Sequence, residues 1–507
     1  MDYIGRKKEH EMLLKACQAE GFKLLGVCGR HGVGKTAFLK SFLKDRRHIC
    51  LTAREMTLER NIESFSRLLF KEAGLEDLGM GLSLNNLQNM LSYIGINASK
   101  GSVAANRAPV EAAAEAKPYK EERLIVVIDD FQYLENADPS FMQSFIRGVE
   151  YELANKELIL IISAPSLEGF SGAVKKTGVS LSGSFEIISL APFDYLAASE
   201  FFPGYSNEEK LLAYGVTGGI PAYMSLFDIN RSARQNIASL FFEKSGALYG
   251  EPLNILRREF RNVGLYNTLL DVIGNGAGRM NEISKGSGYD TPVISPAMKK
   301  LIAHGLVRKE VPVLNGDSKR DTSYVINDPL FGFWYGYVSG AVTEIEGGEG
   351  SRYFEAKAVA GLNEYLKGVF EKVCREYILL KAESGEIPVK LVRAGKWQST
   401  DPKKNTVKIS VVASDEKENT AVIGECHYRN SSMEPEAVDR CIENGKRLNC
   451  EIYKYYMFSK NGYYPSTLRK YRSDEKIKLL TLKDLYPSVG DQAATGQISK
   501  SYFTELS

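Results

Sequence analysis

The hydrophobic pattern of the first 190 residues predicts buried parallel strands that alternate with helices. A strand exposed on one face alternates apolar and polar residues, whereas a continuous apolar run indicates a strand covered on both faces. Residues 7–19 carry apolar positions at helical spacing, and a further helix is expected over 36–44. Continuous apolar runs occur at 124–128 and 158–162, a buried strand is expected over 22–29, and further strands are expected over 48–52 and 185–190. We therefore expect an α/β core with a parallel sheet over residues 1–190.

The rest of the chain shows three further patterns. The apolar spacing is helical over 191–260. It predicts helices followed by a β-hairpin over 262–327, within a domain expected to span 261–342, and mixed helix and strand over 353–487. The Gly-rich, acidic stretch at 343–352 between the last two is the expected linker. Two small or polar stretches are expected to add no core of their own: 98–119, read as an insertion, and 488–507, read as a tail.

Composition narrows the class of protein without identifying it. A chain of 507 residues is longer than one typical core, so several domains are expected. The net charge of +2 gives no global indication of nucleic-acid or membrane binding. Seven scattered cysteines, an N-terminus without an apolar signal region, and no apolar run of spanning length together favour a cytoplasmic protein.

Residues 29–36, GRHGVGKT, have the GxxxxGK[ST] pattern of a phosphate-binding loop, between the expected strand and helix. Glycines let successive backbone N–H groups turn inward around a polyphosphate, and the helix N-terminus adds partial positive charge. The lysine is expected to bridge β- and γ-phosphates, and the threonine to ligate Mg²⁺. We therefore predict an ATP and Mg²⁺ site made by Gly29, Arg30, His31, Gly32, Val33, Gly34, Lys35 and Thr36.

A second signature lies about 95 residues after the loop, where an apolar strand ends in Asp129 and Asp130. Asp129 is expected to hold Mg²⁺ through water, and Asp130 to polarise the attacking water. The alternative is a strand end capped by acids. Ser163 and Ser166, just after the next strand, are candidate sensors of the γ-phosphate, or simple turn residues.

Five further segments are distinctive: IGRKKE at 4–9, DDFQYL at 129–134, LAPFDYL at 190–196, TGGIPAYM at 217–224 and INDPLFGFWYGYV at 326–338. Together with the loop, they resemble the archaeal-type ATPase family, which also occurs in bacteria and belongs to the STAND branch of AAA+-like P-loop ATPases. The resemblance covers nearly the whole chain. Its single motifs are weak, but their combination is specific.

The resemblance implies roles for residues outside the loop. Gly5 and Arg6 are expected near the adenine side of the nucleotide. Gly218, Gly219 and Pro221 are expected to form a lid motif that contacts nucleotide, within a helical lid over 191–260. The alternatives are a plain helix start and a helix-breaking turn.

Two departures from the family pattern bear on turnover. The family usually has Asp-Glu where this chain has Asp129-Asp130, and a displacement near 1 Å can cost about 100-fold in rate. The family also tends to carry an arginine before the LAPF-like segment, where this chain offers only Lys175 and Lys176, which lack a planar guanidinium. We therefore expect an ATPase that binds ATP securely and hydrolyses it slowly.

Residues 261–342 resemble the winged-helix domain of the same family, with 295–304 at the place of a recognition helix. Binding of double-stranded DNA is one implication. The alternative is a domain that packs on the ATPase core as a lid or switch partner, with an ordinary solvated basic face. The residues that could contact phosphates are Lys299, Lys300, Arg308, Lys309, Lys319 and Arg320.

Residues 353–487 resemble the family's C-terminal domain of unknown function, which looks like a restriction endonuclease. An active site of that type needs an Asp on one strand and Glu-x-Lys on the next. Here the Asp position is Ser410 and the Lys position is His427, which leaves Glu425 and Glu371. We expect a degenerate domain without nuclease activity.

The leading hypothesis is thus a cytoplasmic, ATP-binding switch protein with slow hydrolysis, whose expected partners are another protein or a second copy of this chain by self-association. The alternatives are a DNA-binding or DNA-processing factor and a scaffold that binds ATP without turnover.

Overall fold

The computed structural model of the protein divides into two compact units, 1–192 and 193–507, which are described separately. Among the helices that it describes, none is long and apolar enough to cross a membrane. All seven cysteines are free thiols. The described residues are 4–73, 84–99, 123–177, 185–314, 322–400 and 406–487.

The first unit is built on a five-stranded parallel sheet in the order β2-β3-β4-β1-β5. All five expected strands are confirmed: β1 (Lys23–Cys28), β2 (His48–Thr52), β3 (Leu124–Asp129), β4 (Leu158–Ala164) and β5 (Phe185–Ser189). The helices of this unit are α1 (Lys7–Gln18), α2 (Lys35–Leu43), α3 (Leu58–Glu72), α4 (Leu87–Ser99), α5 (Gln132–Ala137), α6 (Phe141–Glu152) and α7 (Glu168–Thr177).

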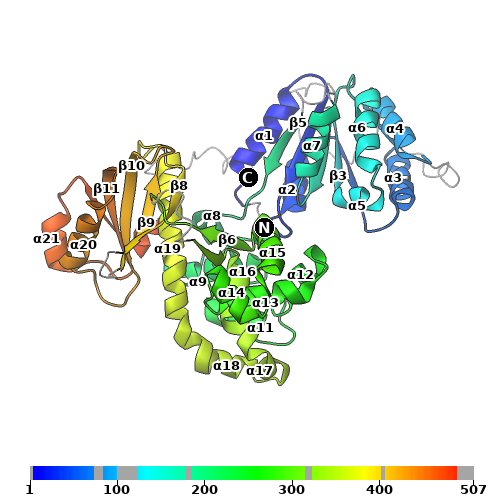
Figure 1. The fold of residues 1–507 in the computed structure, drawn as a ribbon. Helices are drawn as coiled ribbons and strands as arrows, with labels where there is room; N and C mark the ends of the chain where they lie inside the picture. Colours follow the sequence, from blue (N-terminus) through cyan, green and yellow to red (C-terminus); the bar gives the residue numbers. More distant parts are fainter. Residues whose placement is uncertain are drawn as a thin grey trace. The chain divides into compact units, whose positions relative to one another are not determined.

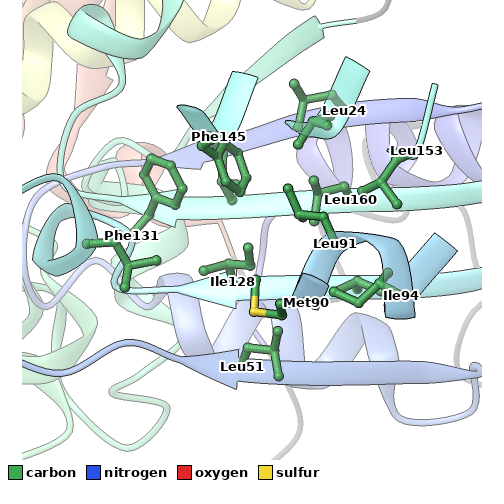
Figure 2. Close-up of a cluster of buried hydrophobic side chains, with 14 of the residues drawn as sticks. Leu24, Leu51, Met90, Leu91, Ile94, Ile128, Phe131, Phe145, Leu153 and Leu160 are labelled. Atoms are coloured by element: carbon green, nitrogen blue, oxygen red, sulfur yellow. The ribbon is translucent and has the colours of Figure 1, made fainter. Parts of the chain in front are cut away.

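One face of this sheet carries a large apolar core (Figure 2). Leu24, Ile128 and Leu160 project from three adjacent strands toward Leu91 of α4 and Phe145 of α6, and all five are fully buried. Burying side chains of this size contributes about 1.5–3 kcal/mol each. The packing fixes the strands so that β1, β3 and β4 end at the same edge of the sheet.

The second unit begins with helices and a small hairpin. The antiparallel pair β6–β7 follows three helices, as the pattern predicts. The elements are α8 (Tyr195–Ser199), α9 (Asn207–Thr217), α10 (Pro221–Met224), α11 (Ala233–Phe241), α12 (Glu251–Glu259), α13 (Val263–Gly274), α14 (Met280–Ser287), α15 (Thr291–Ala303), β6 (Val307–Glu310), β7 (Ser323–Ile326) and α16 (Pro329–Phe333).

A mixed five-stranded sheet in the order β12-β11-β10-β9-β8 completes the second unit. The long helix α19 (Val359–Glu383) runs alongside it and contacts β8, β9 and β10 (Figure 1). The strands of this sheet and the helices that follow α19 are β8 (Arg393–Thr400), β9 (Thr406–Ser414), β10 (Thr420–His427), α20 (Pro435–Gly445), β11 (Glu451–Ser459), α21 (Pro465–Tyr471), β12 (Ile477–Thr481) and α22 (Leu482–Leu485).

The stretch 343–352, expected to be a linker, instead forms parts of two short helices with a turn between them, packed within the second unit. It lies across α17 (Val342–Glu346) and α18 (Gly350–Tyr353). Ile345 is buried, and a Cβ at Gly350 would collide with the carbonyl oxygen of Phe242. The glycine therefore serves a close helix contact, which local composition does not reveal. Most of 98–119, and all of 488–507, lie outside the described residues.

Candidate nucleotide-binding site

The predicted phosphate loop connects β1 to α2. Gly29, Gly32 and Gly34 have φ of 152°, 84° and 91°, values that side chains disfavour. A Cβ at Gly29 would also collide with the carbonyl oxygen of Leu190, so this turn requires glycine. Within the loop, Val33 is buried, Arg30 half-buried and His31 exposed. Such a glycine turn before a helix N-terminus is suited to binding an anion.

Lys35 folds back over this loop. Its Nζ donates to the Gly29 carbonyl oxygen at 2.7 Å. Burial lowers the pKa of Lys35, and the negative charges of Asp129 and Asp130 oppose this shift. The ammonium group therefore lies within the electrostatic reach of both acids and faces the loop that would hold phosphate.

Thr36 and Asp129 bring two possible oxygen ligands for a metal ion together beside the loop. The Thr36 hydroxyl Oγ1 donates to Asp129 Oδ2 at 2.8 Å. Asp129 is only 6% exposed, and its other oxygen, Oδ1, accepts from the backbone N–H of Asp130 at 3.0 Å. Because Mg²⁺ prefers hard oxygen ligands and keeps several waters, one hydroxyl and one nearby carboxylate fit it.

Asp130 follows in a left-handed conformation, with φ of 56°. This conformation is uncommon for residues other than glycine, though aspartate and asparagine adopt it more readily. Its Oδ1 accepts from Gln132 Nε2 at 3.2 Å. Sequence reasoning identified Asp130 but not Gln132, although an amide two residues after an acidic pair was visible in the sequence.

The two candidate sensor serines lie in different environments. Ser163, near the end of β4, is fully buried, and its Oγ has no hydrogen-bond partner among the described residues. Ser166 is exposed and accepts from the backbone N–H of Glu168 at 3.4 Å, as a residue at a helix start does. Lys175 and Lys176 are exposed in the last turn of α7. The sensor role therefore remains a prediction, now centred on Ser163.

Arg6 connects the start of α1 to the phosphate loop. It is buried, and its Nη2 donates to the carbonyl oxygens of Ala191 at 2.5 Å and Val33 at 3.4 Å. Its Nη1 pairs with Glu9 at 3.2 Å. Gly5 precedes it with φ of 71°. Arg6 thus braces the loop through its backbone, and its expected place beside adenine remains a prediction.

The predicted lid motif lies in the second unit, between α9 and α10. Gly218 and Gly219 have φ of 64° and 72°, and Pro221 is the first residue of α10. The Gly219 carbonyl oxygen accepts from the Phe193 N–H at 2.9 Å, and a Cβ at Gly219 would collide with the Phe193 carbonyl oxygen. The turn therefore has a packing reason for its glycines, and contact with nucleotide stays a prediction.

Acids and bases gather where a nuclease of the resembled type would hold its metal. Burial, and secondarily the charge of Glu371, raises the pKa of Glu425 to about 7. Lys396 on β8 pairs with Glu371 at 2.9 Å, and Arg375 donates to the carbonyl oxygen of Ser410 at 3.0 Å. Sequence reasoning missed Lys396 and Arg375 because they come from elements outside the motif.

His427 lies near Ser431, with its Nε2 at 3.1 Å from the serine carbonyl oxygen, and burial lowers its pKa. Across the part of the chain that the structure describes, no cluster of three or more His, Cys, Asp or Glu side chains could hold a metal ion.

Among the candidate phosphate contacts of the predicted winged helix, three lysines are exposed and one arginine is held in an ion pair. Lys299 and Lys300 are exposed on α15, and Lys309 is exposed on β6. Arg308 pairs with Glu310 at 2.8 Å. Lys319 and Arg320 lie outside the described residues.

Two family models match the chain. Residues 3–227 match a model of ATPase domains predominantly from Archaea, and residues 334–438 match a model of archaeal and bacterial proteins of unknown function. An uncharacterised protein of Methanocaldococcus jannaschii is 23% identical over 403 residues, which is 78% of this chain and 81% of that protein.

Two solved structures resemble this chain at lower sequence identity. A Walker-type ATPase of Pyrococcus abyssi is 19% identical, with a TM-score of 0.46 over 66% of this chain and 96% of that one. The ORC2 protein of Aeropyrum pernix is 12% identical, with a TM-score of 0.40 over 68% of this chain and 97% of that one.

The first family model spans the phosphate loop, the two aspartates that end β3, and the glycine turn before α10. Over residues 3–227, the chain is therefore similar to the ATPase domains of the archaeal-type family.

Proposed function

We propose that this chain binds ATP with Mg²⁺ at the loop between β1 and α2, and hydrolyses it slowly. The observation that carries the proposal is the hydrogen bond from Thr36 to Asp129, which sets two oxygen ligands beside a positive-φ glycine loop. When bound, Mg²⁺ would neutralise charge on the β- and γ-phosphate oxygens. Lys35 would exchange the Gly29 carbonyl oxygen for a charged phosphate oxygen, a stronger acceptor for an ammonium group.

In the proposed reaction, water oxygen bonds to the γ-phosphorus, and the bond from that phosphorus to the β,γ-bridging oxygen breaks. The electron pair of the broken bond leaves on ADP, and a water proton passes by way of Asp130 to solvent. Asp130 has a shorter side chain than the family's glutamate, and Lys175 and Lys176 are exposed where the family tends to carry an arginine. For these two reasons we expect turnover well below about 10 s⁻¹, a middle value for enzymes.

Slow turnover suits a switch, because a bound nucleotide then persists long enough to bias which conformation is populated. In this proposal ATP binding changes how the helical and winged-helix regions meet the core, and hydrolysis reverses the change. The C-terminal domain would bind or position a partner without cutting nucleic acid, since Lys396 pairs with Glu371 and Glu425 is the single acid on β10. A scaffold that binds ATP without turnover is the limiting case.

A second candidate function is binding of double-stranded DNA, favoured by the exposed Lys299, Lys300 and Lys309. Phosphate contacts make affinity fall steeply with salt, so titrating random duplex at several salt concentrations tests it directly. Absence of binding at low salt, both with and without ATP, would exclude this function.

Phosphate release by the full chain tests the main proposal. We compare wild type with Lys35→Ala, which removes the phosphate contact, and with Asp130→Asn, which keeps the shape of the carboxylate but not its charge. The proposal expects Lys35→Ala to lose ATP binding and Asp130→Asn to bind ATP but release less phosphate. A wild type that binds ATP and releases phosphate no faster than either variant would leave only the scaffold.

A further inference from the structure

The turn after β3 is held against the end of the neighbouring strand β4. The backbone N–H of Phe131 donates to the Ser163 carbonyl oxygen at 2.8 Å, and that of Tyr133 donates to the Asp130 carbonyl oxygen at 3.0 Å. Gln132 lies between them, as the first residue of α5. Its backbone is therefore fixed beside Asp130, close to the proposed phosphate site.

Only one of the two polar atoms in the Gln132 side-chain amide makes a hydrogen bond among the described residues. Its Nε2 donates to Asp130 Oδ1 at 3.2 Å. Its Oε1 is buried and has no hydrogen-bond partner among the residues that the structure describes. The reverse orientation of the amide would place two acceptors against each other, so the carboxylate selects this one. A buried acceptor without a partner is costly in a folded protein and calls for an explanation.

The chemistry of ATP hydrolysis supplies an explanation for the unpartnered Oε1 of Gln132. A water molecule that attacks phosphorus must direct a lone pair at the phosphorus while its two O–H groups donate elsewhere. The Asp130 carboxylate can accept one of these O–H groups. A glutamine that orients the attacking water is a known solution in phosphoryl transfer. Gln132 Oε1, adjacent to that carboxylate, offers the second acceptor.

We propose that Gln132 is a further residue of the hydrolytic site, which holds Asp130 in place and orients the attacking water through Oε1. The inference rests on the proposed ATPase function. An amide cannot take a proton at neutral pH, so Gln132 contributes orientation while the proton leaves by way of Asp130. A second acceptor also offsets the shorter reach of aspartate, which alone would hold the water less firmly.

The competing explanation is that Gln132 only stabilises the start of α5. The two explanations predict different effects of a Gln132 substitution on kcat, KM and nucleotide affinity. Loss of water orientation lowers kcat and leaves KM and nucleotide affinity unchanged. A disturbed turn would also displace Asp129, a proposed Mg²⁺ contact, and so weaken nucleotide binding.

Steady-state kinetics of full-length variants separates them. Gln132→Leu keeps the approximate size of the side chain and removes both the hydrogen bond to Asp130 and the proposed one to water. Gln132→Ala provides a second variant should leucine prevent folding. Asn136→Ala, at an exposed position of the same helix, is the matched control. Affinity for a non-hydrolysable ATP analogue with Mg²⁺ is measured on each protein.

We expect either Gln132 variant to lower kcat by about 10- to 100-fold, with KM and analogue affinity within about twofold of wild type and Asn136→Ala unchanged. A kcat within twofold of wild type would overturn the inference and leave the ATPase function standing. A loss of analogue affinity in step with kcat would assign Gln132 to structure alone. A wild type no faster than Lys35→Ala would instead remove the ATPase function, and this inference with it.

Discussion

Replacing Glu425 with glutamine should stabilise the protein at alkaline pH and have little effect at acid pH. Glu425 lies on β10, where burial and the nearby charge of Glu371 raise its pKa to about 7, against the lesser opposing charges of Arg440, Arg429 and Lys367. A carboxyl group with a raised pKa binds its proton more tightly in the folded state. Its contribution to stability is therefore fully present below the unfolded pKa of 4.5 and is lost as pH rises through about 7.

The size of the effect follows from the two pKa values. A rise from 4.5 to about 7 corresponds to roughly 3 kcal/mol of folding free energy, because each pKa unit is worth about 1.4 kcal/mol. Glutamine resembles the protonated acid and cannot ionise, so Glu425→Gln avoids this loss. For a unit of this size, roughly 3 kcal/mol should raise Tm by about 5 °C near pH 8.5.

Thermal unfolding of wild type and Glu425→Gln, followed by circular dichroism from about pH 5 to about pH 8.5, measures the difference in Tm as a function of pH. The exposed residue Glu436, on α20 of the same domain, provides the control substitution Glu436→Gln, which should show no pH-dependent difference. A difference in Tm for Glu425→Gln that is constant across pH, or a variant less stable at every pH, would refute the reasoning.

Three other substitutions test the site and its alternatives. Thr36→Ala should weaken ATP binding by about 10- to 100-fold with Mg²⁺ but by less than about threefold in EDTA, because a hydrogen bond or ligand involving a charged group is worth about 1.5–3 kcal/mol. Thr36→Ser keeps the hydroxyl and should bind ATP as wild type does. Equal losses of affinity with and without Mg²⁺, measured by calorimetry, would contradict the metal role. Gly29→Ala should cost about 1–3 kcal/mol in stability and at least tenfold in ATP affinity, since its Cβ meets the Leu190 carbonyl oxygen and its φ is unfavourable; an unchanged Tm and affinity would show that the loop tolerates a side chain. If duplex binds, Lys299→Glu with Lys300→Glu should reduce the slope of log affinity against log salt by about 2, and an unchanged slope would place the contacts elsewhere.

The sheet and the phosphate loop could be predicted because their signals are local. A continuous apolar run encodes a covered strand wherever it occurs, and GRHGVGKT places glycines, lysine and threonine at fixed positions on one turn. The acids that end β3 could be assigned to the same site because parallel strands β1 and β3 end at one edge of the sheet. The strand pattern, the loop motif and the shared edge of the sheet depend on the local geometry of the chain more than on neighbouring domains.

The interactions that were missed depend on partners distant in sequence. Arg6 reaches the carbonyl oxygen of Ala191, and Lys396 reaches Glu371, across separations that no local pattern encodes. The stretch 343–352 was read as a linker from its glycine and charge content, whereas Gly350 allows α18 to approach Phe242 closely. Gln132 had a local signal, but its importance depends on an oxygen buried without a partner, which is visible only in three dimensions.

A structure of the full chain with Mg²⁺ and a non-hydrolysable ATP analogue tests the central claim most directly. The account predicts that Lys35 Nζ leaves the Gly29 carbonyl oxygen and contacts the β- and γ-phosphates. It also predicts that Thr36 Oγ1 ligates Mg²⁺, with Asp129 reaching the ion through water. Phosphates bound outside the loop, with Lys35 still donating to Gly29, would contradict it.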